Sequence, residues 1–190
     1  MENIDREILN RASAGDIQAF EFVYKASSSF VYNVAYRVVG NREDAFEVAQ
    51  EVFMIIHDKL KSFRFESSFK TWVYRITANT AINYAKKTVR SKTVSFEDFL
   101  IEPAVNSQAV DRLQEQDNQQ LLGAFLNELN PEQRACVVLR EIEGLSYQQV
   151  AASLNININT VRTRLKRARE KLLNLRKSIR SMNDEKLRVF

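Results

Sequence analysis

Glycine and proline are scarce in this chain of 190 residues, with only 4 and 2 of them. All-β folds use many such residues in their turns, so the scarcity favours an all-helical protein. Hydrophobic residues make up 45% of the chain, which is enough for folded cores and too much for a disordered chain. The length allows one domain or two small ones.

Cysteine and histidine occur once each, as Cys136 and His57. A single cysteine excludes an internal disulfide and a multi-thiolate metal site. Cys136 lies in an apolar stretch, so we expect a buried thiol and not a nucleophile. With no second histidine or cysteine near it, His57 does not suggest a zinc site or a Cys-His dyad. Glycine-rich phosphate loops are also lacking, so the sequence gives little support to an enzyme and we expect no cofactor.

Long apolar runs are missing as well. No stretch approaches the roughly 20 residues needed to span a bilayer. The first residues, Met-Glu-Asn-Ile-Asp, lack the basic and apolar regions of a signal peptide. We therefore expect a cytoplasmic protein. The net charge of +4 says little until its distribution along the chain is known.

Apolar residues recur at helical spacing in the first half of the chain. Asp16 is a plausible N-cap of a first helix, which Gly40 ends. Asn41 and Asp44 resemble a capping box at the start of the next helix. We expect helices over residues 16–40, 41–60 and 69–87.

Residues 91–117 have a different character. They contain Pro103, show weak periodicity and are net acidic. The simplest interpretation is a flexible acidic linker. It would join two small helical domains, over residues 1–90 and 118–180, with residues 181–190 as a tail.

The second block has the clearest helix signals in the chain. Capping boxes are expected at residues 130–133 and 146–149. A short helix over 147–153 is followed by Asn155, which suits a left-handed C-cap, and by Asn157, which can cap a last, longer helix. A short helix, a turn of about four residues and a longer basic helix describe a helix-turn-helix.

The last helix is strongly basic. Nine bases stand against a single acid, Glu170, before Asp184. Solvated helices normally mix charges, because opposite charges four residues apart stabilise them. This excess therefore favours binding to nucleic acid, although a basic solvated or membrane-surface helix is the alternative. The nine are Arg162, Arg164, Lys166, Arg167, Arg169, Lys171, Arg176, Lys177 and Arg180.

One helix of the first block interleaves aromatic and basic side chains. This pattern suits single-stranded nucleic acid, because rings stack on bases while cations follow the backbone. The alternative is that the rings are core, and we expect Trp72, its neighbour Ile76 and about half of the set to be buried. The set comprises Phe63, Phe65, Phe69, Trp72, Tyr74 and Tyr84, with Arg64, Lys70, Arg75, Lys86, Lys87 and Arg90.

Two motifs resemble a known family. Residues 41–53 and then 69–79 are similar to region 2 of the sigma-70 family, and residues 146–151 with 159–172 are similar to its region 4. The chain leaves no room for the other regions, so it resembles the compact extracytoplasmic-function group of RNA polymerase sigma factors. The likeness covers about residues 10 to 175. It implies an all-α protein in which a region 2 helical bundle and a region 4 helix-turn-helix are joined by the acidic linker.

The resemblance implies an alternative sigma factor that binds core RNA polymerase and directs promoter-specific transcription initiation. Phe46 stands where the family usually has an acid, so we expect the polymerase contact to differ in detail. The family docks on a coiled coil of the largest catalytic subunit, and the matching residues are Asp44, Glu47, Gln50, Glu51 and Phe53. The spacing alone puts Asp44, Glu47 and Glu51 on one outward face.

The resemblance also implies that the loop over residues 63–69 and the helix after it capture a flipped base of the minus-10 element and help to melt the duplex. The loop lacks the glycine often seen there, with Arg64-Phe65-Glu66 instead, and Asn83 replaces a frequent Asp. Both differences are expected to affect which base the loop prefers. The expected minus-10 residues are Arg64, Phe65, Lys70, Arg75, Asn79, Asn83, Lys86 and Lys87. The expected minus-35 residues are Asn159, Thr160, Arg162, Thr163, Arg164, Lys166 and Arg167, near the start of the last helix.

The implied partners are core RNA polymerase, promoter DNA and an anti-sigma factor. The linker is expected to thread through the RNA path of the polymerase. The alternative function is a helix-turn-helix regulator that binds operators as a dimer and uses the first block for sensing or oligomerisation. A sigma factor should copurify with core polymerase, whereas such a regulator should bind duplex DNA alone.

Overall fold

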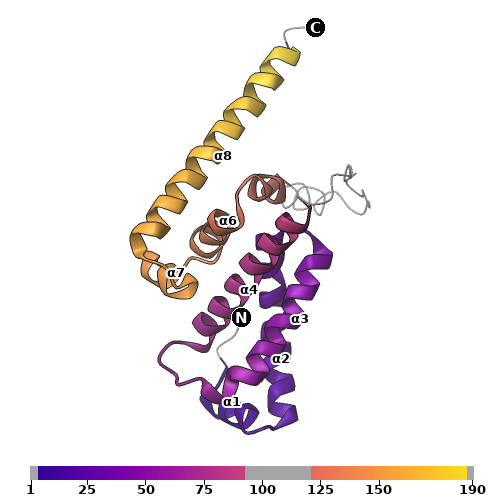
Figure 1. Ribbon diagram of the computed structural model, residues 1–190, viewed down its shortest axis with the longest axis vertical. Helices are drawn as coiled ribbons and strands as arrows, with labels where there is room; N and C mark the ends of the chain where they lie inside the picture. Colours follow the sequence, from indigo (N-terminus) through magenta and orange to yellow (C-terminus); the bar gives the residue numbers. More distant parts are fainter. Residues whose placement is uncertain (1–3, 93–120, 188–190) are drawn as a thin grey trace.

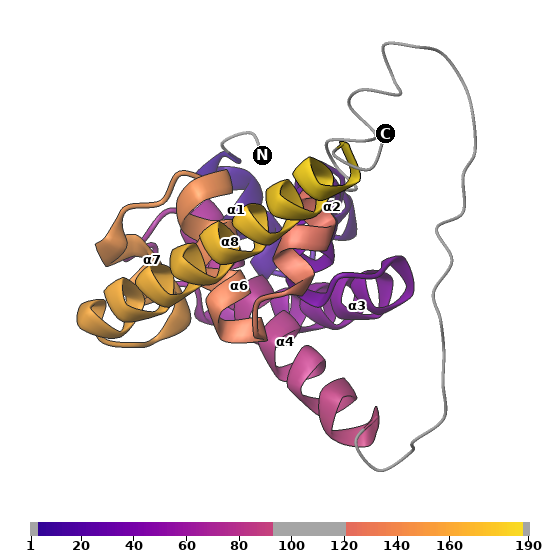
Figure 2. The same ribbon diagram turned by 90° about the horizontal axis from the view of Figure 1, so that it is seen from above.

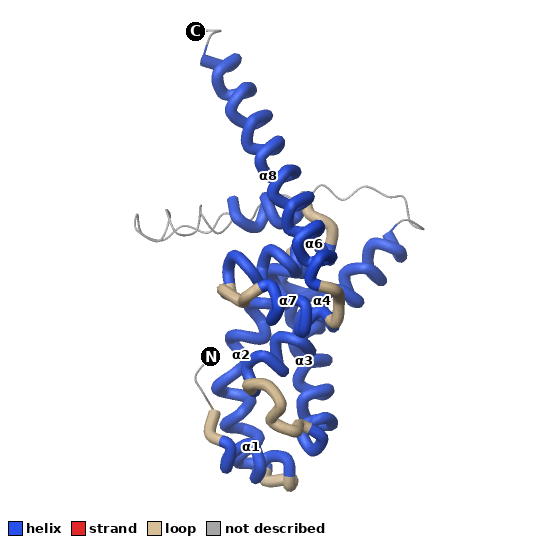
Figure 3. Tube along the Cα trace, turned by 90° about the vertical axis from the view of Figure 1, so that its left-hand side faces the viewer, coloured by secondary structure: helices blue, strands red, loops and turns tan. Residues whose placement is uncertain are grey.

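The computed structural model describes residues 4–92 and 121–187 of the chain, and helices account for most of them (Figures 1 and 3). No strand occurs in these two ranges. The first domain consists of α1 (Arg6–Ser13), α2 (Ile17–Val39), α3 (Arg42–Lys59), a 3-10 turn (Leu60–Ser62) and α4 (Phe69–Lys92). Helices α2, α3 and α4 pack against one another, and α1 lies against α2.

Local polar contacts set the ends of these helices. Oδ1 of Asp16 accepts hydrogen bonds from the backbone of Gln18 and Ala19, at 3.0 and 3.1 Å. Gly40 ends α2 with a φ of +93°, and Oδ1 of Asn41 accepts from the Asp44 backbone at 2.8 Å. The three predicted helices are confirmed as α2, α3 and α4, with α4 continuing past the expected end at 87. Helix α1 was not expected from the sequence.

The core of the first domain is built from β-branched and small side chains spaced three or four apart. Val48, Val52 and Ile56 of α3 are completely buried, as the periodicity predicts. Each such side chain contributes roughly 1.5–3 kcal/mol by leaving water. Their partners across the core include Val23, Val31, Val34 and Val38 of α2 and Val73 and Ala78 of α4.

The second domain contains a helical stretch over residues 121–127, then α6 (Pro131–Val137), a π-helical turn (Val138–Ile142), α7 (Tyr147–Leu154) and α8 (Ile158–Leu187). Both capping boxes form as predicted, Asn130 with Gln133 and Ser146 with Gln149. Helices α6 and α7 lie between α8 and the first domain, as the two views in Figures 1 and 2 show. The C-terminal part of α8 extends beyond the rest of the described chain (Figure 3).

The two domains pack directly on each other. Helix α4 contacts α6 and α7, and α2 contacts α6. Arg134 of α6 is buried at this junction and donates to the carbonyl oxygens of Val38 at 3.0 Å, Leu129 at 3.1 Å and Asn127 at 3.2 Å. A methyl group on Gly40 would overlap the side chain of Asn127. Gly40 therefore permits both the left-handed backbone after α2 and the close approach of the second domain.

Two other expectations concern the remaining segments. Most of the predicted acidic linker, from residue 93, lies outside the described residues. Helix α8 continues past the expected boundary at residue 180 to Leu187.

No described helix is both long and apolar enough to cross a membrane. Cys136 is a buried free thiol, as expected.

Candidate polymerase and nucleic-acid interfaces

The five predicted docking residues all lie on α3, but they occupy two sides of it. Glu47 and Glu51 are exposed, whereas Asp44 is half-buried. Asp44 accepts hydrogen bonds from the Tyr84 hydroxyl at 3.1 Å and from Nδ2 of Asn41 at 2.6 Å. Burial raises the pKa of Tyr84, and the hydrogen bond to Asp44 and the charges of Asp44, Glu47 and Glu51 raise it further. Of these carboxylates, Asp44 is therefore engaged inside the domain, whereas Glu47 and Glu51 stay exposed on the surface.

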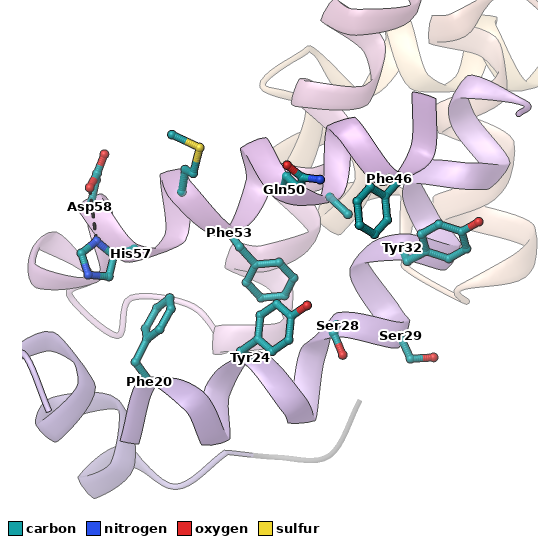
Figure 4. Close-up of a pocket in the computed structure, with 12 residues that line it drawn as sticks. Phe20, Tyr24, Ser28, Ser29, Tyr32, Phe46, Gln50, Phe53, His57 and Asp58 are labelled. Carbon is teal, nitrogen blue, oxygen red and sulfur yellow. Dashed lines mark hydrogen bonds and ion pairs between the residues drawn. The ribbon is translucent and has the colours of Figure 1, made fainter. Parts of the chain in front are cut away.

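The other two predicted residues, Gln50 and Phe53, line an apolar groove between α2 and α3 (Figure 4). The volume of the groove is about 810 Å³. Phe46 and Met54 are 59% and 69% exposed at this surface, and Tyr24 packs on Phe53 with ring centroids 4.6 Å apart. Contiguous exposed apolar surface of this kind is typical of interaction sites.

The groove was missed from the sequence, although a signal for it exists. Phe46, Ala49 and Phe53 form a second apolar stripe at helical spacing, next to the stripe that fills the core. A helix packed against one core buries one apolar stripe. The second apolar stripe therefore predicts an exposed apolar surface on this helix. Phe46, noted as a departure from the family pattern, belongs to this stripe.

The predicted minus-10 residues of α4 follow one side of that helix. Arg75, Asn79, Asn83 and Lys87 are spaced four apart, which places them above one another along the helix. All of them are exposed except Asn79, which is half-buried. Lys70, at the start of the helix, is exposed, and its Nζ lies 5.9 and 5.8 Å from the ring centroids of Phe30 and Tyr74.

The second domain covers the middle of this face. Nδ2 of Asn79 donates to the carbonyl oxygen of Ser153 in α7 at 2.8 Å. Further along, Nζ of Lys86 lies 2.6 Å from Oε1 of Glu132 in α6. Burial alone would raise the pKa of Glu132, but the hydrogen bond and charge of Lys86 hold it below its usual value. Two predicted DNA-contacting residues therefore bind the second domain in this arrangement.

The aromatic side chains divide between core and surface. Phe69 and Tyr74 are buried, at 6% and 2% exposed. Phe63, Phe65 and Trp72 are half-buried, and the ring centroid of Phe63 lies 4.7 Å from that of Phe65 and 5.1 Å from that of Trp72. Trp72, expected in the core, packs against it but keeps part of its surface accessible.

Phe65 has a backbone conformation that favours glycine, with a φ of +58°. For a residue with a side chain this conformation costs roughly 1–2 kcal/mol. The Arg6 guanidinium lies 4.3 Å from the Phe65 ring centroid, a contact worth roughly 0.5–1 kcal/mol at an exposed site. The loop thus has a glycine-like backbone at Phe65. Arg64, next to it, is exposed.

Helices α7 and α8 form the predicted helix-turn-helix. Val150 and Leu154 of α7 and Val161 and Leu165 of α8 are buried in the shared core. Asn155 adopts a φ of +52° in the turn, as predicted for a left-handed C-cap. The start of α8 is fixed in turn by Asn157, whose Oδ1 accepts from the Asn159 backbone at 2.8 Å.

Five of the seven predicted minus-35 residues are exposed on the first turns of α8. Nη1 of Arg162 donates to Oδ1 of Asn159 at 3.0 Å, and the Thr163 hydroxyl donates to the Asn159 carbonyl at 2.9 Å. Lys166 and Arg167 are exposed one turn later. This part of α8 therefore presents donors and positive charge on its outer surface.

The other two, Thr160 and Arg164, are half-buried. Burial raises the pKa of the Cys136 thiol to about 11, and the nearby Arg164 opposes that shift. The charge of Arg164 also lowers the pKa of Glu132. Arg164 therefore lies beside α6, on the inner side of α8.

Two known family models match this chain. The model described as sigma-70 region 2 matches residues 23–91, and the model described as sigma-70, region 4 matches residues 119–172. These ranges cover most of α2, all of α3, nearly all of α4 and the helix-turn-helix.

Curated relatives match along most of the chain. The ECF RNA polymerase sigma-E factor of Haemophilus influenzae is 33% identical over 180 residues, covering 90% of this chain and 94% of the relative. The sigma-E factor of Escherichia coli K12 is also 33% identical over 180 residues, covering 90% and 93%.

Solved structures show the same fold. CnrH, solved with the cytosolic domain of CnrY, has a TM-score of 0.65 at 22% identity, covering 92% of this chain and 97% of CnrH. The sigma factor RpoE of Bartonella quintana, solved with the anti-sigma factor NepR, has a TM-score of 0.63 at 26% identity, covering 85% and 98%. The chain belongs to the sigma-70 family, among the ECF RNA polymerase sigma factors.

Proposed function

We propose that this protein is a cytoplasmic sigma factor without chemistry of its own, which binds core RNA polymerase and directs it to specific promoters. The observation that carries the proposal is the combination, in one chain, of a basic helix-turn-helix in the second domain with a first domain that has a basic helix face and a separate acidic and apolar face. A simple operator-binding protein needs only the first of these. The names of the relatives point to the same activity.

The docking surface for polymerase combines charge with apolar contact. Glu47 and Glu51 give α3 an exposed acidic side, and the groove beside it exposes Phe46 and Met54. A helical partner with basic and apolar side chains would complement both parts. The carboxylates would steer the encounter, and the groove would supply the buried apolar core of the complex.

DNA contact is divided between the two domains. The exposed side of α4 with Arg75, Asn83 and Lys87 would bind the minus-10 element as single strand, with the aromatic loop before α4 receiving a flipped base. The exposed start of α8, with Arg162 and Thr163, would read the minus-35 element in the major groove.

We also infer control by an anti-sigma factor. The sigma factor RpoE, 26% identical to this chain, was solved with the anti-sigma factor NepR. The apolar groove of α2 and α3 is a surface that a partner helix could cover, as polymerase would. Competition for one groove would keep polymerase and the inhibitor from binding together.

Reconstitution with core RNA polymerase tests the proposal. The purified chain should co-elute with core polymerase and start transcripts at promoters that core polymerase alone does not use. Transcript-start mapping after overexpression would give the sequences. If the chain failed to bind core polymerase and bound duplex DNA alone as a dimer, it would instead be a helix-turn-helix regulator.

A further inference from the structure

A cavity of about 510 Å³ lies between the N-terminal segment and the loop that precedes α4. Its volume falls within the roughly 300–1,000 Å³ of small-ligand pockets. Half of its lining comes from residues 4–9, which precede the matched range of region 2. Its apolar lining is Ile4, Leu9, Phe65 and Phe69, and its polar lining is Asp5, Arg6, Ser67 and Ser68.

The Arg6–Phe65 contact forms one wall of this cavity. The guanidinium lies 4.3 Å from the ring centroid, and the Phe63 ring packs on Phe65 with centroids 4.7 Å apart. With a φ of +58°, Phe65 needs contacts of its side chain to hold a conformation that favours glycine. Arg6 supplies such a contact from a different element, α1.

We propose that Arg6 is a positioning residue for a nucleobase, which fixes Phe65 so that an unpaired base of promoter DNA enters this cavity. The inference rests on the proposed minus-10 function and adds α1 to its site. Aromatic rings and guanidinium planes are the surfaces on which splayed bases stack. Asp5, Ser67 and Ser68 carry the acceptors and hydroxyl groups that the edge of a base can bind.

The location of the cavity supports single-stranded DNA as the occupant. The cavity is bounded by Phe69, the first residue of α4, and Lys70 and Arg75 are exposed on the same helix. A strand whose base enters the cavity can therefore run along basic side chains that attract its phosphates. An apolar ligand alone would leave the polar half of the lining without a role.

The test uses the full chain bound to core polymerase and fork-junction DNA whose single-stranded minus-10 segment is randomised. Selection with the unmodified protein gives the base preference at each position. Arg6→Ala should abolish the preference at one position, with a loss of about tenfold there, within the range of one base stack. Arg6→Lys should restore part of it, because an ammonium group can also sit over the ring.

Arg11→Ala is the matched control. Arg11 lies on the same helix but pairs with Asp16 and does not line the cavity, so its profile should equal that of the unmodified protein. Phe65→Gly is a second variant, because glycine accepts the backbone conformation while the stacking wall is lost. It should remove the preference at the same position as Arg6→Ala.

Two results would overturn the inference. The first is an unchanged preference profile for both Arg6→Ala and Phe65→Gly. The second is a uniform loss at all positions that Arg6→Lys does not rescue, which would give Arg6 a structural role only. A lack of any base preference in the unmodified protein would instead refute the proposed minus-10 function, and the inference with it.

Discussion

The hydroxyl of Tyr74 donates a hydrogen bond to Oε2 of Glu143 at 2.8 Å and so joins α4 to the second domain. Oε1 of the same carboxylate accepts from Nη1 of Arg37 in α2 at 2.9 Å. Glu143 therefore receives one bond from each of two helices of region 2. Burial and the Glu143 carboxylate raise the pKa of Tyr74, so the hydroxyl stays a donor at neutral pH.

Tyr74→Phe should loosen the contact between the domains. The substitution leaves a mostly buried carboxylate with one donor fewer, which costs roughly 1–3 kcal/mol. A double-mutant cycle with Glu143→Gln, measured by urea unfolding, should give a coupling energy of about 0.5–3 kcal/mol. Strict additivity of the two changes would show that the bond contributes nothing to stability.

The same contact predicts an alkaline dependence. A tyrosine whose pKa is raised in the folded state contributes stability that is complete below about pH 10, the ordinary tyrosine pKa, and is lost as pH rises above it. The unmodified protein should therefore lose more stability than Tyr74→Phe between pH 9 and 11, in roughly the range where exposed tyrosines titrate. Thermal unfolding of both proteins across this range measures the difference, and parallel curves would contradict it.

Gly40→Ala should destabilise more than Gly15→Ala. Both glycines have similar φ values, +93° and +98°, so the backbone strain is matched. Only at Gly40 does an added methyl group overlap another side chain, that of Asn127 in the second domain. We expect each substitution to cost about 1 kcal/mol or more from strain, with a further loss at Gly40. Equal changes in the free energy of unfolding would mean that the domains do not approach each other at Gly40.

Arg162→Ala should weaken binding to minus-35 DNA by roughly 1–3 kcal/mol if Arg162 contacts a base. If Arg162 contacts a phosphate instead, the slope of log affinity against log salt concentration should fall in magnitude by about 1. Arg169→Ala is the control, because Arg169 lies on the same helix with its Nη2 2.6 Å from Oε1 of Glu141. Fluorescence anisotropy at several salt concentrations separates the two cases. Normal affinity and slope for Arg162→Ala would remove it from the recognition surface.

Glu51→Lys should reduce assembly with core polymerase, because it reverses a charge on the exposed acidic side of α3. Glu21→Lys on α2 is the charge-matched control, since Glu21 is paired with Lys25 and does not line the groove. Competition against the unmodified protein for limiting core polymerase measures the difference. Equal competition by both variants would exclude Glu51 from the docking surface.

Local signals predicted most of the helices correctly. Asp16, Asn130 and Ser146 cap helices where the sequence places them, because a cap depends on residues only two or three positions apart. Helix α1 was overlooked because its eight residues are too few to show a sustained apolar period, although Asp5 and Gly15 mark its two ends.

The sequence patterns did not predict contacts between residues that are far apart in the chain. Nothing near Asn79 indicates that its amide binds the Ser153 carbonyl, because 74 positions separate the two residues. The inner placement of Arg164 likewise depends on how α8 packs on α6, and a count of basic residues does not distinguish an inner from an outer arginine. Asp44 was expected on the docking face but accepts a hydrogen bond from the Tyr84 hydroxyl of α4. This contact also depends on how distant parts of the chain pack together.

If Asn79 contacts minus-10 DNA as proposed, its hydrogen bond to Ser153 would make DNA binding a competition within one molecule. A nucleotide that takes the Asn79 amide must displace the Ser153 carbonyl, so only molecules whose domains have separated there can bind it. The apparent dissociation constant for minus-10 DNA then equals the intrinsic constant divided by the fraction of open molecules. Anything that raises that fraction would then strengthen promoter binding without a new contact to DNA.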